Sequence, residues 1–231
     1  MRRRRQRPER SVIEAILPVG ARVAEEFGAR LVHGLYPEEE AVVADAAPRR
    51  REEFAAVRRC ARRALEQLGR PPAPVLPGPG GAPVWPGDVV GSMTHCAGYR
   101  AAVVADRSTL ATIGIDAEPD EPLPVDVVRV IARPEEIALF HAAGSVQPFN
   151  GDRLLFSAKE AVYKAWYPLT GRWLDFDDVS VLPDPHARRF TARVLAPAPD
   201  DMQHFSGTWT VASGLILTVC VHGAWGDPPR G

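Results

Sequence analysis

The sequence predicts an α+β fold, because helical and strand-like patterns occupy separate stretches of the chain. A strongly amphipathic helix comes first, and several short β-like runs follow it. A second group of helices then precedes a long stretch that reads as strands. With 231 residues, of which 45% are hydrophobic, the chain can bury a full core in one large domain or two smaller ones.

The first helix is expected over Arg50–Leu68, where apolar residues recur at helical spacing and arginines fill the polar side. Gly69 and Pro71 end this helix, and glycine and proline dominate an extended connector that runs to Gly87. Three β-like runs follow, at Val89–His95, Tyr99–Ala105 and Ala111–Glu118.

The acidic, proline-rich segment Asp120–Pro124 is typical of a linker, and it divides the chain into residues 1–119 and residues 120–231. In the second part the pattern predicts two short helices, Val125–Ala132 and Glu135–Ala142. A longer helix is expected at Asp152–Trp166, ending before Pro168. The expected strands are Val179–Leu182, Phe190–Leu195, Thr208–Val211 and Leu215–Val221.

Composition argues against several classes of protein. The formal net charge of -1 gives no overall positive field for nucleic acid, and the basic run Arg2–Arg5 is expected to be a solvated tail. Cys60, Cys96 and Cys220 are too few and too widely spaced for a disulfide framework or a zinc site. No apolar stretch approaches the roughly 20 residues that span a bilayer. We therefore expect a cytoplasmic protein.

The basic residues are almost all arginine, and the only two lysines, Lys159 and Lys164, lie in one short stretch. A GC-rich genome would explain the arginine bias without any function. A lysine ammonium is nevertheless a compact charge that can donate a proton, whereas a guanidinium stays protonated at ordinary pH. Residues 156–166 are therefore a candidate functional segment.

A pair of acids ends the third β-like run. Apolar and polar residues alternate over Ile113–Glu118, so Asp116 and Glu118 are expected to project to the same side of a strand. Two carboxylates this close repel one another unless a cation sits beside them. The alternative is an exposed strand end with two solvated acids.

The segment Phe156–Trp166 places Glu160 and Lys164 four residues apart on a helix. Alone, it could be a surface ion pair beside an aromatic stripe of the core. Together with the strand acids it is more specific, because Mg²⁺ prefers carboxylate and phosphate oxygens. Asp116, Glu118 and Glu160 could hold such an ion, while Lys159 and Lys164 neutralise a pyrophosphate, which is the equipment of phosphoryl transfer.

The order of these motifs resembles the signature of the 4′-phosphopantetheinyl transferase superfamily. The matching stretches are G-I-D at Gly114–Asp116 and F-S-A-K-E-A-V-Y-K at Phe156–Lys164. G-S-M-T-H-C at Gly91–Cys96 is similar to a motif of the larger, Sfp/EntD-like group that modifies carrier proteins of secondary metabolism. The helix pattern R-R-x-E-F-x-x-V-R-x-C-A-R at Arg50–Arg62 is similar to single-chain bacterial members.

The resemblance implies two similar α+β halves related by a pseudo-twofold, with coenzyme A in the cleft between them. It implies transfer of 4′-phosphopantetheine from coenzyme A to a serine of an apo acyl or peptidyl carrier protein, with adenosine 3′,5′-bisphosphate as the second product. The cofactor would be Mg²⁺, with Mn²⁺ as an alternative. A single chain that carries both halves is expected to act as a monomer.

By position, the resemblance implies that Asp116, Glu118 and Glu160 hold the metal ion, and that Glu160 also takes the proton of the attacking serine. Lys159 and Lys164 would contact phosphate oxygens, and Lys164 is the better candidate to protonate the departing phosphate. Both assignments follow from matching motif positions, not from spacing alone.

The remaining positions carried over concern the rest of coenzyme A. The expected nucleotide and phosphate contacts are Ser92, His95, Arg50, Arg51 and Arg58, although the arginines could equally form a solvated helix face. The expected walls of the pantetheine site are Phe156, Tyr163 and Trp173, each of which could instead be plain core. One departure is Pro77, which stands where close relatives place a lysine, so a neighbouring arginine would have to supply that charge.

Two rival functions share part of this pattern. A metal-dependent phosphohydrolase would use the same acids and basic residues but would need no protein acceptor. A non-catalytic module could grip anionic partners through the arginine-rich helix. Neither rival accounts for all of the motifs in their order along the chain.

Overall fold

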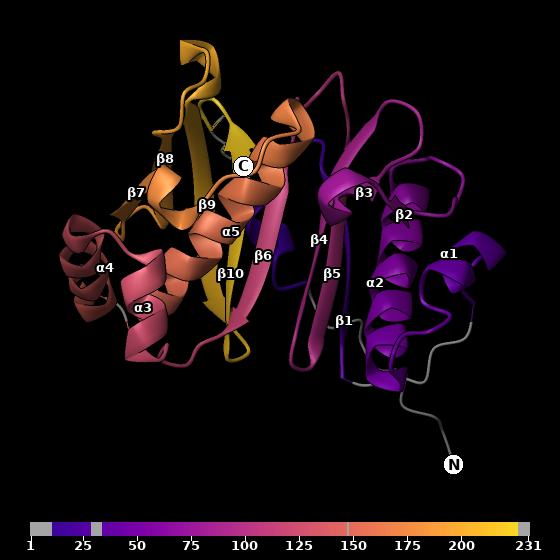
Figure 1. The fold of residues 1–231 in the computed structure, drawn as a ribbon, viewed down its shortest axis with the longest axis horizontal. Coiled ribbons are helices and arrows are strands. Elements are labelled where there is room, and N and C mark those ends of the chain that lie inside the picture. Colours follow the sequence, from indigo (N-terminus) through magenta and orange to yellow (C-terminus); the bar gives the residue numbers. More distant parts are fainter. Residues whose placement is uncertain (1–10, 29–33, 147, 226–231) are drawn as a thin grey trace.

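The computed structural model describes residues 11–28, 34–146 and 148–225, which form two α+β halves packed side by side (Figure 1). Each half is a sheet with one long helix lying across it. The α+β class predicted from the sequence is confirmed. The arginine run at residues 2–5 lies outside the described residues.

The first half is a three-stranded antiparallel sheet in the order β1-β5-β4. Its strands are β1 (Arg22–Phe27), β4 (Val89–Cys96) and β5 (Tyr99–Asp106), and helix α2 (Pro48–Gln67) packs on them. The helix buries small residues such as Ala61 and Ala64 against Ala102 and Val104 of β5, which lets it lie close to the sheet. Shorter elements complete this half: 3₁₀ helix η1 (Glu14–Ile16), helix α1 (Pro37–Val42), and a small hairpin of β2 (Leu76–Pro77), η2 (Pro79–Gly81) and β3 (Pro83–Val84).

The second half is a five-stranded antiparallel sheet in the order β6-β10-β9-β8-β7. Its strands are β6 (Gly114–Pro119), β7 (Val179–Asp184), β8 (Arg189–Val194), β9 (His204–Ala212) and β10 (Leu215–His222). Helix α5 (Gly151–Thr170) crosses this sheet, with α3 (Val125–Ile131) and α4 (Pro134–Val146) beside it (Figure 1). The short 3₁₀ helices η3 (Phe176–Asp178) and η4 (Asp200–Met202) fill the connections. Trp166, Phe190, Phe205 and Trp209 are the large side chains of its core.

Helix α5 and strand β6 touch backbone to backbone at Gly114. A Cβ at this position would lie 1.9 Å from the carbonyl oxygen of Ala161, a distance that no side chain tolerates. The glycine of the G-I-D motif is therefore required by packing. It brings the face of α5 that carries Glu160 and Lys164 close to Asp116.

The two sheets meet where β4 and β6 lie next to each other at the centre of the molecule (Figure 1). Hydroxyl groups bridge this seam. Ser92 Oγ accepts a hydrogen bond from the Ile115 amide at 3.0 Å, and Thr94 Oγ1 accepts one from the Ala117 amide at 3.1 Å. Side chains of β4 thus satisfy edge amides of β6, which would otherwise be buried without partners.

Two sequence predictions need correction. The run ending at Glu118 was placed in the first half, but β6 pairs with β10, so the change between halves falls between Asp106 and Gly114 and not at the Asp120–Pro124 linker. The apolar pattern of this run could not show which sheet it joins. Helix α5 also continues past Pro168 to Thr170. A proline in the last turn removes few helical hydrogen bonds, and Gly171 in the left-handed conformation ends the helix.

Candidate active site

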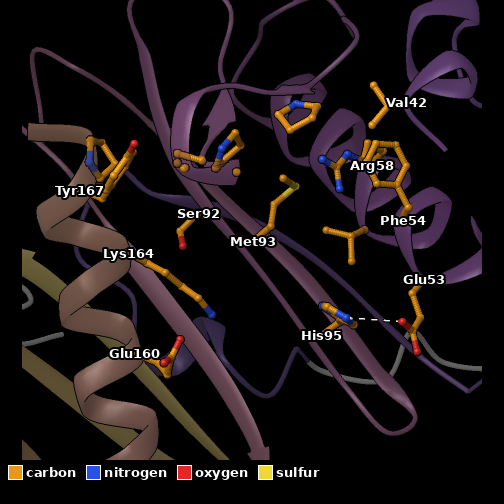
Figure 2. Close-up of a pocket in the computed structure, with 18 of the residues that line it drawn as sticks. Val42, Glu53, Phe54, Arg58, Ser92, Met93, His95, Glu160, Lys164 and Tyr167 are labelled. Carbon is orange, nitrogen blue, oxygen red and sulfur yellow. Dashed lines mark ion pairs between the residues drawn. The ribbon is translucent and has the colours of Figure 1, made fainter. Parts of the chain in front are cut away.

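A cavity of about 420 Å³ opens along the seam between the two halves. Figure 2 shows α5 on one side, β4 in the middle and α2 on the other. The hairpin of residues 76–84 contributes Pro77, Gly80 and Gly81 to the lining. The acidic and basic side chains that line it are Arg50, Glu53, Arg58, His95, Glu160 and Lys164.

Asp116 is buried next to Lys164, which lines this cavity, and has 4% of its surface exposed. Its Oδ1 accepts hydrogen bonds from Lys164 Nζ at 2.6 Å and from Thr94 Oγ1 at 3.2 Å. Its Oδ2 is buried and has no partner. Hydrogen bonds therefore fix one oxygen of this carboxylate, while the other is buried without a partner. A ligand that contacts Oδ2 would satisfy it.

Glu118 and Glu160 both lie within the electrostatic reach of Asp116. Burial raises the pKa of Glu118, and the charge of Asp116 raises it further. Burial likewise raises the pKa of Glu160, which Lys164 lowers and Asp116 raises. Arg153 holds Glu118 in an ion pair of 2.9 Å. Glu118 at the strand end and Glu160 on the helix are therefore both close enough to Asp116 for its charge to shift their pKa values.

These acids do not form a preorganised metal-binding site in the structure. Within residues 11–28, 34–146 and 148–225, no three acidic, histidine or cysteine side chains are already arranged to hold a metal. The bare Oδ2 of Asp116 nevertheless suits a hard cation, because such ions take carboxylate oxygens as ligands. Lys164 and Arg153 act as the internal counter-charges of the acids.

His95 and two arginines form the basic side of the cavity. His95 Nε2 lies 3.6 Å from Glu53 Oε2, an interaction drawn as a dashed line in Figure 2. Burial lowers the pKa of His95, while Glu53 opposes that shift. Arg58 stacks over the Phe54 ring at 3.4 Å, and its burial lowers its pKa to about 10. Arg50 is exposed and lines the same cavity, as Ser92 does.

A smaller cavity of about 140 Å³ lies beside Glu160. Tyr163 and Trp173 line it, with ring centroids 5.0 Å apart. The Tyr163 hydroxyl is buried without a partner, and Trp173 is 68% exposed. Tyr163 and Trp173, which were predicted to line the pantetheine site, thus line a cavity next to Glu160.

Three predicted site residues are held by contacts within the protein and do not line the main cavity, although Lys159 lines the smaller one. Arg51 Nη1 donates to the Ala44 carbonyl and lines neither cavity described above. Phe156 packs into the core of the second half, 5.8 Å from the Phe176 ring. The Lys159 ammonium is buried in an ion pair with Glu136 and not in the main cavity. Successive helix residues point about 100° apart, so Lys159 and Glu160 face different neighbours.

Sequence reasoning did not single out several residues of the site. Glu53 orients His95, and Thr94 holds both Asp116 and the Ala117 amide. Glu53 belongs to the helix pattern at Arg50–Arg62, and Thr94 belongs to the motif at Gly91–Cys96. These two motifs were the sequence signal that could have found them. Arg153, the partner of Glu118, and Tyr167, which lines the main cavity, carried no signal of their own. An arginine is common on a helix surface, and the tyrosine reads as an aromatic residue of the core.

The comparisons with known proteins agree with this architecture. Residues 38–105 match the 4′-phosphopantetheinyl transferase N-terminal domain, and residues 112–220 match the 4′-phosphopantetheinyl transferase superfamily. The two matched regions meet where the structure changes from β5 to β6. The fold and site define a two-half α+β protein with a basic, acid-flanked cleft on its seam.

Similar proteins include the 4′-phosphopantetheinyl transferase Svp of Streptomyces mobaraensis, 52% identical over 189 residues, which covers 80% of this chain and 77% of the relative. PptT of Mycobacterium tuberculosis is 45% identical over 80% of this chain and 85% of its own. Npt of Nocardia iowensis is 40% identical over 91% of this chain and all of its own. The chain belongs to the 4′-phosphopantetheinyl transferase superfamily.

As a member, it transfers the 4′-phosphopantetheine moiety of coenzyme A to a serine hydroxyl of an apo carrier protein, and it releases adenosine 3′,5′-bisphosphate. Enzymes of this family are generally dependent on Mg²⁺. In the part of the chain that the structure describes, no helix has the length and apolar character needed to cross a bilayer.

The hydroxyl of Thr94 gives a first test of the site. Thr94→Val keeps the shape but removes the donor to Asp116 and the acceptor for the Ala117 amide. We expect a loss of about 1–3 kcal/mol in the free energy of unfolding, together with a clear fall in kcat. Thr112→Val is the matched control, because it deletes a buried hydrogen bond to the Ala165 carbonyl without touching the acids. Equal falls in kcat for both variants would contradict a positioning role of Thr94.

Proposed function

We propose that Asp116, Glu118 and Glu160 hold a Mg²⁺ ion, with Mn²⁺ as a substitute, beside the diphosphate of coenzyme A. The observation that carries this proposal is the bare, buried Oδ2 of Asp116. Two further acids whose pKa values are raised support it, since a cation would relieve their repulsion. Bound there, the ion would neutralise charge on the phosphate oxygens.

Glu160 is the proposed general base, because it lines both cavities and makes no ion pair among the described residues. It takes the proton of the carrier serine as the serine oxygen attacks the phosphorus that bears pantetheine. The bond from that phosphorus to the bridging oxygen breaks, and Lys164 gives a proton to the departing phosphate. An ammonium suits this role because it can release a proton, unlike a guanidinium.

The basic side of the cleft is proposed to hold the nucleotide and its 3′-phosphate. Arg50, Arg58 and His95 converge on the main cavity, and guanidinium groups match phosphate geometry well. Ser92 lines the same wall. Pro77 also lines this cavity, so Arg50 and Arg58 are the arginines placed to supply the charge that a lysine would otherwise bring. Arg51 is not included, because its guanidinium is directed to Ala44.

The smaller cavity is proposed to receive the pantetheine arm, between Tyr163 and Trp173. Phe156 supports this wall from behind through its contact with Phe176, which also lines the cavity. Acyl and peptidyl carrier proteins are the proposed acceptors, and a monomer working in the cytoplasm is the proposed state. The three free cysteines are consistent with a reducing compartment.

The direct test follows the mass of an apo carrier protein incubated with coenzyme A, Mg²⁺ and this enzyme. We expect the carrier to gain one phosphopantetheine, and Asp116→Ala to abolish the gain while the circular dichroism spectrum is unchanged. Hydrolysis of coenzyme A without a carrier would favour a phosphohydrolase. Full turnover by Asp116→Ala would refute the proposed metal site.

A second prediction concerns stability in metal-free buffer. Because the pKa of Glu160 is raised above its ordinary value of 4.5, the folded protein binds more protons than the unfolded chain just above that pH. The free energy of unfolding therefore falls as pH rises through this window. Glu160→Gln removes the effect, so we expect a higher melting temperature at pH 7 and kcat lowered by about 10²–10⁴-fold.

Glu135→Gln is the control for this prediction, since the pKa of Glu135 is lowered by Arg133 and the sign is reversed. It should leave transfer unchanged and should not raise the melting temperature. If Glu160→Gln were less stable than the parent protein at pH 7 without metal, the assignment of Glu160 as a partly buried, unpaired base would be wrong.

A further inference from the structure

A buried ion pair joins helix α5 to the neighbouring helix α4. Lys159 Nζ lies 2.7 Å from Glu136 Oε2, and the two side chains are 1% and 0% exposed. Charged groups this deeply buried are costly unless every donor and acceptor finds a partner. The pair lies outside the main cavity that holds Lys164.

The Lys159 ammonium has no donor left for a ligand. It has three N–H bonds and no acceptor. Besides Glu136, it donates to the Ile131 carbonyl and to the Phe176 carbonyl, both at 2.8 Å. A phosphate contact would require one of these buried hydrogen bonds to break.

Both carboxylate oxygens of Glu136 also accept hydrogen bonds from the backbone. Its Oε1 accepts a hydrogen bond from the Val181 amide at 2.8 Å, and its Oε2 accepts one from the Arg133 amide at 2.9 Å. The pair therefore ties α5 to the end of α3, the first turn of α4, η3 and β7. It acts as a lock at the point where these five elements meet.

This lock adjoins the proposed catalytic groups. Lys159 is the residue before Glu160, and its side chain lines the smaller cavity together with Glu160 and Tyr163. Residues 173–176 also line this cavity, and the Phe176 carbonyl is one of the atoms that Lys159 holds. The hydrogen bond thus joins two residues of the cavity lining, one on α5 and one on η3.

We propose that Lys159 is a positioning residue and not a phosphate ligand: its ion pair with Glu136 fixes the turn of α5 that carries Glu160 and sets the width of the smaller cavity. This inference rests on the proposed role of Glu160 as the base. It predicts that Lys159 affects turnover much more than the binding of coenzyme A.

Two variants separate the two roles. Lys159→Met leaves the Glu136 carboxylate buried without a cation, so we expect a lower melting temperature. Kcat should fall by about 10- to 100-fold, since small displacements of a catalytic group are costly, while KM for coenzyme A changes by less than about twofold. The double variant Lys159→Met, Glu136→Gln removes both charges and keeps an acceptor for a backbone amide. It should regain the melting temperature and most of kcat.

The opposite result would overturn the proposal. If the double variant regains its melting temperature but shows KM for coenzyme A raised by about tenfold or more, Lys159 binds phosphate directly. A double variant that is no more stable than Lys159→Met would equally show that the Lys159–Glu136 ion pair does not fix the turn of α5 that carries Glu160.

A second measurement uses the parent protein and avoids variants that fail to fold. The chain has only two lysines, so labelling lysine with ¹³C and ¹⁵N gives just two Cε–Nζ signals. We expect added coenzyme A to shift the Lys164 signal and to leave the slowly exchanging Lys159 signal in place. A larger shift at Lys159 would overturn the inference. If neither signal moves while Lys159 exchanges slowly, the lock is supported and the proposed phosphate site of Lys164 fails.

Discussion

The direct contact between helix α5 and strand β6 is the constraint on which the site depends. Because Gly114 has no side chain, the helix approaches the strand closely enough for Lys164 to reach Asp116. The acids of the strand end and Glu160 of the helix can then act on one another across this contact. A larger residue at position 114 would push the helix away and separate Asp116 from Glu160 and Lys164.

Placing three acids around this contact has a cost, and the fold offsets it with its own basic residues. Lys164 and Arg153 balance Asp116 and Glu118, while burial keeps the pKa of Glu160 above its ordinary value. The electrostatic free energy of these acids is therefore least favourable when no cation is bound. In the proposed function a cation and a diphosphate bind together and bring opposite charges, so they would replace these internal pairs without leaving a net charge buried.

Much of this arrangement was predictable, because it depends on short-range periodicity. Alternation along β6 predicted that Asp116 and Glu118 share a side, and helical spacing joined Glu160 to Lys164. The partner of a strand or the face of a helix depends instead on tertiary packing. For this reason β6 was assigned to the wrong half, and Lys159, adjacent to a site residue, was expected to face the ligand when it faces Glu136. Strand β1, which completes the first sheet, was not predicted at all.

The two lysines show why a chain so rich in arginine keeps an ammonium at these positions. At Lys164 the proposed role as a proton donor requires a proton that can be released, which a guanidinium does not supply. At Lys159 the requirement is geometric, because three acceptors surround the nitrogen and each N–H meets one of them. A guanidinium would bring five donors into this dry space, and the two in excess would remain unpaired at considerable cost. One residue type thus serves two purposes five positions apart, and only the packing of α5 distinguishes them.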